Sequence, residues 1–162
     1  MKKIPKKNYI YVTILSLFTI ILTFYLSNLY LVNKRSENKI SFVSEIKENE
    51  LKSYLDETHE IIIYMSESKN KENDKLEEEL KKYTQKNNLE DKYLYLDLSM
   101  VSSNFYNEFY VNYINEAYKG NFEIKDPTII YIKNKKVESY NNNIKDINDV
   151  KKFFYENEVI EW

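Results

Sequence analysis

The chain has 162 residues, enough for one modest domain and an anchor. It contains no cysteine, one histidine and one glycine, which argues against disulfides, thiol chemistry, glycine-rich phosphate loops and histidine-based zinc sites. The formal net charge is −2, but four lysines precede residue 33, and the rest of the chain carries 20 basic against 26 acidic residues. An acidic domain is a poor nucleic-acid binder, because affinity for phosphates depends on Lys and Arg.

The first expected element is a membrane anchor. Residues 9–32 carry no charge, and about 20 apolar residues cross a hydrocarbon core of about 30 Å. We predict a signal anchor at 9–32, a cytoplasmic N-terminus at 1–8 and a polar tether at 33–39. The four preceding lysines outnumber the positive charges just after the segment, which places the domain of residues 40–162 outside the cytoplasm of a single-pass protein. A cleaved signal peptide is the alternative, although the apolar run is long and no small-residue cleavage site follows it.

The first half of the domain alternates between strand and helix patterns. Residues 40–46 have the β-branched and aromatic character of a short edge strand, and 48–57 have the spacing of an amphipathic helix. The apolar runs 61–65 and 93–98 are typical of strands that are covered on both faces. Between them, a polar stretch leads into a helix at 74–86, on which the consecutive acids Glu77, Glu78 and Glu79 are expected to be solvated.

The second half is expected to close the sheet with a hairpin. Residues 103–118 form a helix with two adjacent aromatic stripes, which is either core or a partner surface. Residues 128–132 and 137–140 are short strands separated by a Lys-Asn-Lys-Lys turn, and Asp146 is a plausible N-cap for a last helix to about 157. The order β-α-β-α-β-α-β-β-α implies an α/β fold with a mixed central sheet flanked by helices.

Two stretches carry a resemblance to a known family. Residues 61–76, IIIYMSESKNKENDKL, look like the strand, CxxC turn and first helical turn of a thioredoxin active site, and residues 126–137, DPTIIYIKNKKV, resemble its cis-proline strand and hairpin. Over residues 40–157 the chain resembles the thioredoxin-like proteins called bacteriocin-transport accessory proteins of Gram-positive bacteria. The resemblance implies that the Asp126–Pro127 peptide bond is cis.

The sequence departs from that family at the catalytic turn. Asn70 and Asn73 stand where the two cysteines would be, with Lys71 and Glu72 between them. An amide cannot become a thiolate, so neither attack on a disulfide nor a mixed disulfide is possible. The chain is therefore expected to be a redox-inactive protein rather than an enzyme. We expect no cofactor and no metal, and the lone His59 is interpreted as an ordinary surface residue.

The resemblance leaves one feature that a binding protein could use. In thioredoxins the residue before the cis-proline offers its backbone to an extended peptide, which is strand addition. The candidate groove consists of Ser66, Asp126, Pro127 and Thr128, beside the vestigial active-site turn Asn70, Lys71, Glu72 and Asn73.

Two functions remain open at this point, beside an enzyme that uses no cysteine, which is the least expected because the sequence shows no set of nucleophile, base and orienting residue. The first is an accessory or binding protein that contacts an exported peptide or a membrane protein partner, in peptide or bacteriocin export or in immunity to it. The alternative is a structural subunit that assembles with a membrane transporter through its transmembrane helix.

Overall fold

The computed structural model describes residues 6–160, of which residues 6–10, 12 and 30–39 are described by their backbone alone. The chain divides into two compact units between Ser36 and Glu37. Strands β1 to β4 and helices α2 to α5 all belong to the second unit.

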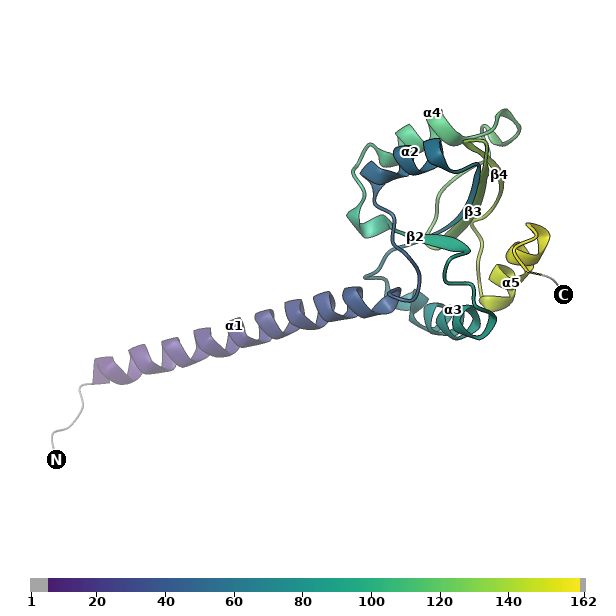
Figure 1. Ribbon diagram of the computed structural model, residues 1–162. Helices are drawn as coiled ribbons and strands as arrows, with labels where there is room; N and C mark the ends of the chain where they lie inside the picture. Colours follow the sequence, from purple (N-terminus) through teal and green to yellow (C-terminus); the bar gives the residue numbers. More distant parts are fainter. Residues whose placement is uncertain (1–5, 161–162) are drawn as a thin grey trace. The chain divides into compact units, whose positions relative to one another are not determined.

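The first unit is built on helix α1 (Lys6–Lys39), a continuous helix of 34 residues (Figure 1). The segment predicted as a tether, residues 33–39, is helical and continues α1. The side chains that are described between residues 11 and 29 are all exposed, including Phe18, Phe24 and Tyr25. Within the described part of the chain, no helix is both long enough and apolar enough to span a membrane. The anchor and the domain boundaries stay predictions.

The second unit is built on a four-stranded sheet with the order β2-β1-β3-β4. The strands are β1 (Glu60–Ser66), β2 (Tyr93–Asp97), β3 (Thr128–Lys133) and β4 (Lys136–Asn141). β1 pairs parallel with β2 and antiparallel with β3, which pairs antiparallel with β4. The mixed sheet confirms the predicted strands at 61–65, 93–98, 128–132 and 137–140, each to within two residues.

Helices cover both faces of this sheet, as Figure 1 shows. Helices α3 (Asp74–Asn87) and α5 (Ile147–Glu156) lie on one face, where Ile62 and Tyr64 of β1 belong to the same buried cluster. Helices α2 (Glu48–Glu57) and α4 (Phe105–Tyr113) lie on the other, with Ile63 and Met65. Because successive residues of a strand point to opposite faces of the sheet, the continuous apolar run of β1 contributes side chains to the core on both faces.

The expected edge strand at 40–46 is mostly wrong. Only Glu45 forms a bridge, which is parallel to Tyr95 of β2. The Ile46 amide donates to the Tyr95 carbonyl (2.8 Å), and the Tyr95 amide donates to the Ser44 carbonyl (3.0 Å). Phe42 and Val43 are buried in the α3/α5 cluster, whereas Ile46 is buried in the α2/α4 cluster. The chain therefore crosses the sheet edge here, and neighbouring residues cannot keep the alternation of a strand.

The expected helix at 103–118 is shorter in the structure. α4 ends at Tyr113, and Ile114 takes an extended conformation with a buried side chain. The Asn115 side chain then accepts a hydrogen bond from the Ala117 amide and starts a separate 3-10 turn at Glu116–Tyr118. Local bonds of this kind compete with helix continuation. Of the aromatic stripes, Phe105 and Phe109 are buried and Tyr106 is exposed.

The hairpin and the last helix follow the prediction. Asn134 and Lys135 form a two-residue turn between β3 and β4, and both have positive φ, 50° and 63°. The Asp146 side chain accepts a hydrogen bond of 2.7 Å from the Asn148 amide and caps α5.

Candidate functional site

The candidate site lies where β1 ends and β3 begins. The Asp126–Pro127 peptide bond is cis, as predicted. Because β1 and β3 are antiparallel neighbours, the last residues of β1 meet the first of β3, and Met65 pairs with Thr128. After Ser66 the chain forms a loop, in which Asn70 caps a short 3-10 turn (Lys71–Asn73) that leads directly into α3.

The Asp126 carboxylate holds this loop. It accepts hydrogen bonds from the Asn70 Nδ2 atom (2.7 Å to Oδ2), the Asn73 Nδ2 atom (2.6 Å to Oδ1) and the Glu67 backbone amide (3.0 Å to Oδ1). We call these four residues the Asp126 clamp. The side-chain amides of Asn70 and Asn73 therefore bind the residue that precedes the cis-proline. Hydrogen bonds to an ionised acceptor are about twice as strong as bonds between neutral groups.

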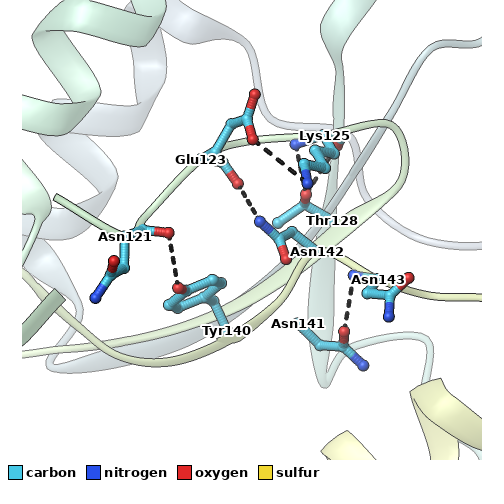
Figure 2. Close-up of polar contacts among 8 residues, drawn as sticks. All are labelled: Asn121, Glu123, Lys125, Thr128, Tyr140, Asn141, Asn142 and Asn143. Carbon is cyan, nitrogen blue, oxygen red and sulfur yellow. Dashed lines mark hydrogen bonds and ion pairs between the residues drawn. The ribbon is translucent and has the colours of Figure 1, made fainter.

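The segment before Asp126 is fastened to strand β4 and to the residues that follow it (Figure 2). The Tyr140 hydroxyl donates to the Asn121 carbonyl (3.3 Å), and the Asn142 Nδ2 atom donates to the Glu123 carbonyl (2.8 Å). The Thr128 hydroxyl closes a local turn, because it donates to the Lys125 carbonyl (2.8 Å) and accepts from the Lys125 amide (2.9 Å). These bonds fix the direction in which the chain reaches the clamp.

A second aspartate holds the other side of the loop. Asp97, at the end of β2, accepts from the Ser68 amide (3.1 Å) and from the Ser99 amide (2.8 Å) and hydroxyl (2.7 Å) at a single oxygen, Oδ1. The Ser68 and Ser99 hydroxyls are also within hydrogen-bond distance, 3.2 Å. The loop is thus held from both neighbouring strands.

Below the loop lies a buried polar layer. Ser66 is fully buried, and its hydroxyl donates to Glu77 Oε1 (2.8 Å) while its carbonyl accepts from the Tyr95 hydroxyl (3.0 Å). Burial, and secondly the charge of Glu77, raise the pKa of Tyr64 well above its ordinary value. The interpretation of Glu77 as a solvated residue is wrong, because it is only 1% exposed and faces Ser66.

The predicted site residues are brought together to different degrees. Asn70, Asn73 and Asp126 are in direct contact, whereas Lys71 and Glu72 are exposed. Pro127 and Thr128 are buried, so they shape the site rather than present side chains to a ligand. The predicted loop, residues 66–73, contains Glu67 and Ser68 but gave them no separate role, and the prediction missed Glu77 and Asp97. Asp97 ends an apolar strand, which is a weak signal, whereas nothing in the sequence separates Glu77 from the neighbouring acids of α3.

This arrangement cannot perform thiol–disulfide exchange, because no residue of the chain carries a thiol. The Ser66 hydroxyl donates to the Glu77 carboxylate, a contact that can activate a serine nucleophile. Ser66 is 0% exposed, however, so a substrate cannot reach its hydroxyl. Among the described residues, no cluster of His, Asp and Glu could hold a metal ion. His59 is exposed, as expected.

Comparison with solved structures identifies the fold. The structure is similar to thioredoxin f2 of Chlamydomonas reinhardtii, with a TM-score of 0.52 and 11% identity over 74% of this chain and 99% of that one. A putative oxidoreductase with a thioredoxin fold gives a TM-score of 0.47 and 10% identity over 67% and 91% of the two chains. No family model and no curated protein matches the sequence. The chain therefore has a thioredoxin-like fold, which confirms the predicted mixed sheet flanked by helices, whereas the transmembrane helix that precedes it stays a prediction. The low identity carries nothing beyond the fold.

Proposed function

We propose that this chain is a membrane-anchored, redox-inactive thioredoxin-like accessory protein that binds an extended peptide segment beside Pro127. The carrying observation is the Asp126 clamp, in which the residues at the cysteine-equivalent positions bind the residue before the cis-proline. The loop is therefore held in one conformation without a disulfide. A site that is ordered before its ligand arrives loses less conformational entropy on binding.

The covered edges of the sheet favour this site over ordinary strand pairing. Residues 44–46 lie along the outer edge of β2. At β4, the Tyr118 hydroxyl donates to the Glu138 carbonyl and the Tyr140 hydroxyl donates to the Asn121 carbonyl, so residues 118–121 cover part of that edge. Natural sheets cover their edges in this way against unwanted pairing.

The N-terminal segment supports the anchor. Residues 9–32 carry no charge, and the described side chains of α1 between 11 and 29 are exposed to solvent rather than packed. In water such a surface is unfavourable, whereas a bilayer of suitable thickness accommodates it. The lysines before the segment favour a cytoplasmic N-terminus and an extracytoplasmic domain. In this proposal the partner is an exported peptide or a membrane protein, and the process is peptide or bacteriocin export, or immunity to it.

Co-purification from native membranes after cross-linking tests the binding role. We expect a specific partner with the wild-type chain and a loss of at least half of the captured partner when Asn70 and Asn73 are both changed to Ala. A double Asn107→Ala and Asn112→Ala change on exposed positions of α4 is the matched control. Equal capture of the partner by all three proteins would show that the clamp does not contribute to binding.

A structural subunit is the second candidate, favoured by the same exposed apolar helix. In that case α1 assembles with a transporter, and the outer domain has no ligand of its own. Replacing residues 9–32 with an unrelated apolar helix separates the two functions. Retained capture supports the domain as the binding part, and lost capture at an unchanged membrane level supports the helix.

A further inference from the structure

A cavity of about 500 Å³ lies beside the end of β2. It is lined by residues at the start of α2, at the end of β2 and just after β2, and by Glu108 of α4. Helices α2 and α4 cover the same face of the sheet (Figure 1). None of the four clamp residues lines the cavity, so it is a separate place in the fold. Its volume is in the range of small-molecule binding sites.

Hydrogen bonds tie two walls of this cavity together. Ser102, in the loop after β2, donates through its amide to Glu48 Oε2 and through its hydroxyl to Glu48 Oε1, at 2.6 Å each. Glu48 is the first residue of α2, so these bonds hold the loop against the helix. Met100, in the same loop, also lines the cavity and is 73% exposed. A flexible Met side chain without cover can close over an apolar ligand.

The buried carboxylate of Asp97 lines the cavity with one oxygen to spare. Asp97 is only 7% exposed, and its Oδ1 atom accepts all three hydrogen bonds from Ser68 and Ser99. Its Oδ2 atom accepts none from the described residues and is not sealed from solvent. A carboxylate that is removed from water is costly while an oxygen lacks a partner, so a donor that enters the cavity is stabilised at Oδ2.

The charges around the cavity favour a cation. Four carboxylates and two ammonium groups line it, which leaves a net charge of −2; they belong to Glu45, Glu48, Asp97 and Glu108, and to Lys47 and Lys52. Both lysines are exposed, and neither forms an ion pair with a carboxylate among the residues whose side chains are described. The Asp97 charge is therefore not neutralised from within the cavity.

We propose that this cavity binds an ammonium or guanidinium group carried on an apolar chain. The charged group donates to Asp97 Oδ2, and the chain packs against Ile46, Met100 and Val101, which also line the cavity. A free organic amine and a Lys or Arg side chain of a peptide both carry this chemistry. The site goes beyond the peptide-binding function proposed for the groove at Pro127 and does not rest on it. Anionic ligands are repelled by the net charge of the lining.

A methyl NMR titration of the full chain in a neutral detergent tests the proposal. The probes are n-pentylammonium and a five-residue capped peptide with one central lysine between glycines, and N-pentylacetamide is the uncharged control. We expect saturable shifts of the Ile46, Met100 and Val101 methyl groups with a charged probe. The methyl groups of Ile144 and Val150, in the α3/α5 cluster, should not shift. N-pentylacetamide should bind about tenfold more weakly than n-pentylammonium.

Three variants locate the binding. Asp97→Asn keeps an acceptor oxygen for the Ser68 and Ser99 donors but replaces Oδ2 by an NH₂ group, and it should bind the charged probe about tenfold more weakly. Val101→Phe fills part of the cavity and leaves every carboxylate in place, so it should abolish the saturable shifts. Glu138→Gln, at an exposed position of β4, also removes one carboxylate charge and should bind as the wild type does.

The two charged probes separate the sources of the ligand. Tighter binding of n-pentylammonium assigns a free amine to the cavity, and tighter binding of the peptide assigns a side chain. Equal binding of charged and uncharged probes, binding that is unchanged in Val101→Phe, or no shift with either charged probe overturns the proposal. If Asp97→Asn does not fold, Val101→Phe and the uncharged probe still decide the outcome.

Discussion

At the scale of single residues, the clamp shows how one carboxylate can order the loop that follows β1. Asn70 and Asn73 are separated from Asp126 by 56 and 53 residues, yet both amides bind one carboxylate. A carboxylate accepts several donors at once, so one side chain fastens a whole loop. Asn70 and Asn73 are therefore structural members of the clamp.

Removing the charge of Asp126 should destabilise the fold. Asp126→Asn replaces one acceptor oxygen by an NH₂ group that faces donors, and we expect a loss of about 2 kcal/mol in the free energy of unfolding. Chemical denaturation of the purified chain measures it. Glu123→Gln, on an exposed neighbouring residue, is the control and should change stability by less than about 0.5 kcal/mol. Equal effects of the two changes would mean that the clamp contributes nothing to stability.

The hairpin turn carries backbone strain that can be relieved. Lys135 has a φ of 63°, a conformation that costs a residue with a Cβ atom about 1 kcal/mol and that glycine adopts freely. Lys135→Gly should therefore raise the free energy of unfolding by about 1 kcal/mol, because its exposed ion pair with Asp56 contributes little. Asn134→Gly is the comparison, with a smaller gain expected because Asn tolerates this conformation better. A loss of stability in Lys135→Gly would show that the ion pair outweighs the strain.

At the scale of the elements, burial explains which of the strands and helices predicted from the sequence are present in the structure. The four central strands were predictable because a short apolar run needs cover on both faces, and α3 and α5 because their apolar stripes follow the helical repeat. The conformation of residues 40–46 was not predictable in this way, because Phe42 and Ile46 pack on opposite faces of the sheet. Glu77 was misread because its partner, Ser66, is eleven residues away in sequence and only folding brings them together.

The tyrosines of the sheet predict how stability depends on alkaline pH. Burial raises the pKa of Tyr93 and Tyr95, and burial with the Glu60 carboxylate raises the pKa of Tyr131 to about 12 from an ordinary value of 10. The folded state therefore holds these protons more tightly than the unfolded state does. Their contribution to stability is complete below pH 10 and is lost progressively as the pH rises from 10 through 12.

Denaturation midpoints at a series of alkaline pH values test this dependence. The wild type should lose stability above pH 10, and Tyr131→Phe should show a shallower loss between pH 10 and 12 because it has no proton to release at that position. Tyr155→Phe, on the exposed face of α5, should follow the wild type. A flat profile up to pH 12 would contradict the assigned shifts.

At the scale of the whole molecule, two units with different surfaces are joined in one chain. The described part of α1 exposes apolar side chains, whereas the second unit buries its apolar residues on both faces of a sheet. The fold of the second unit and the cis Asp126–Pro127 bond could be predicted from the apolar runs and the Pro127 motif. The clamp could not, because nothing in sequence spacing pairs an aspartate with two asparagines more than fifty residues away.

Site-specific photo-cross-linking in native membranes tests the central claim most directly. A photoreactive residue at Glu72, in the exposed part of the loop, should form a specific adduct with a peptide or membrane protein, and Asp126→Asn should reduce its yield severalfold. The same group at Asn87, at the far end of α3, should give no such adduct. An adduct from Asn87 but not from Glu72, or no change with Asp126→Asn, would contradict a binding site at the clamp.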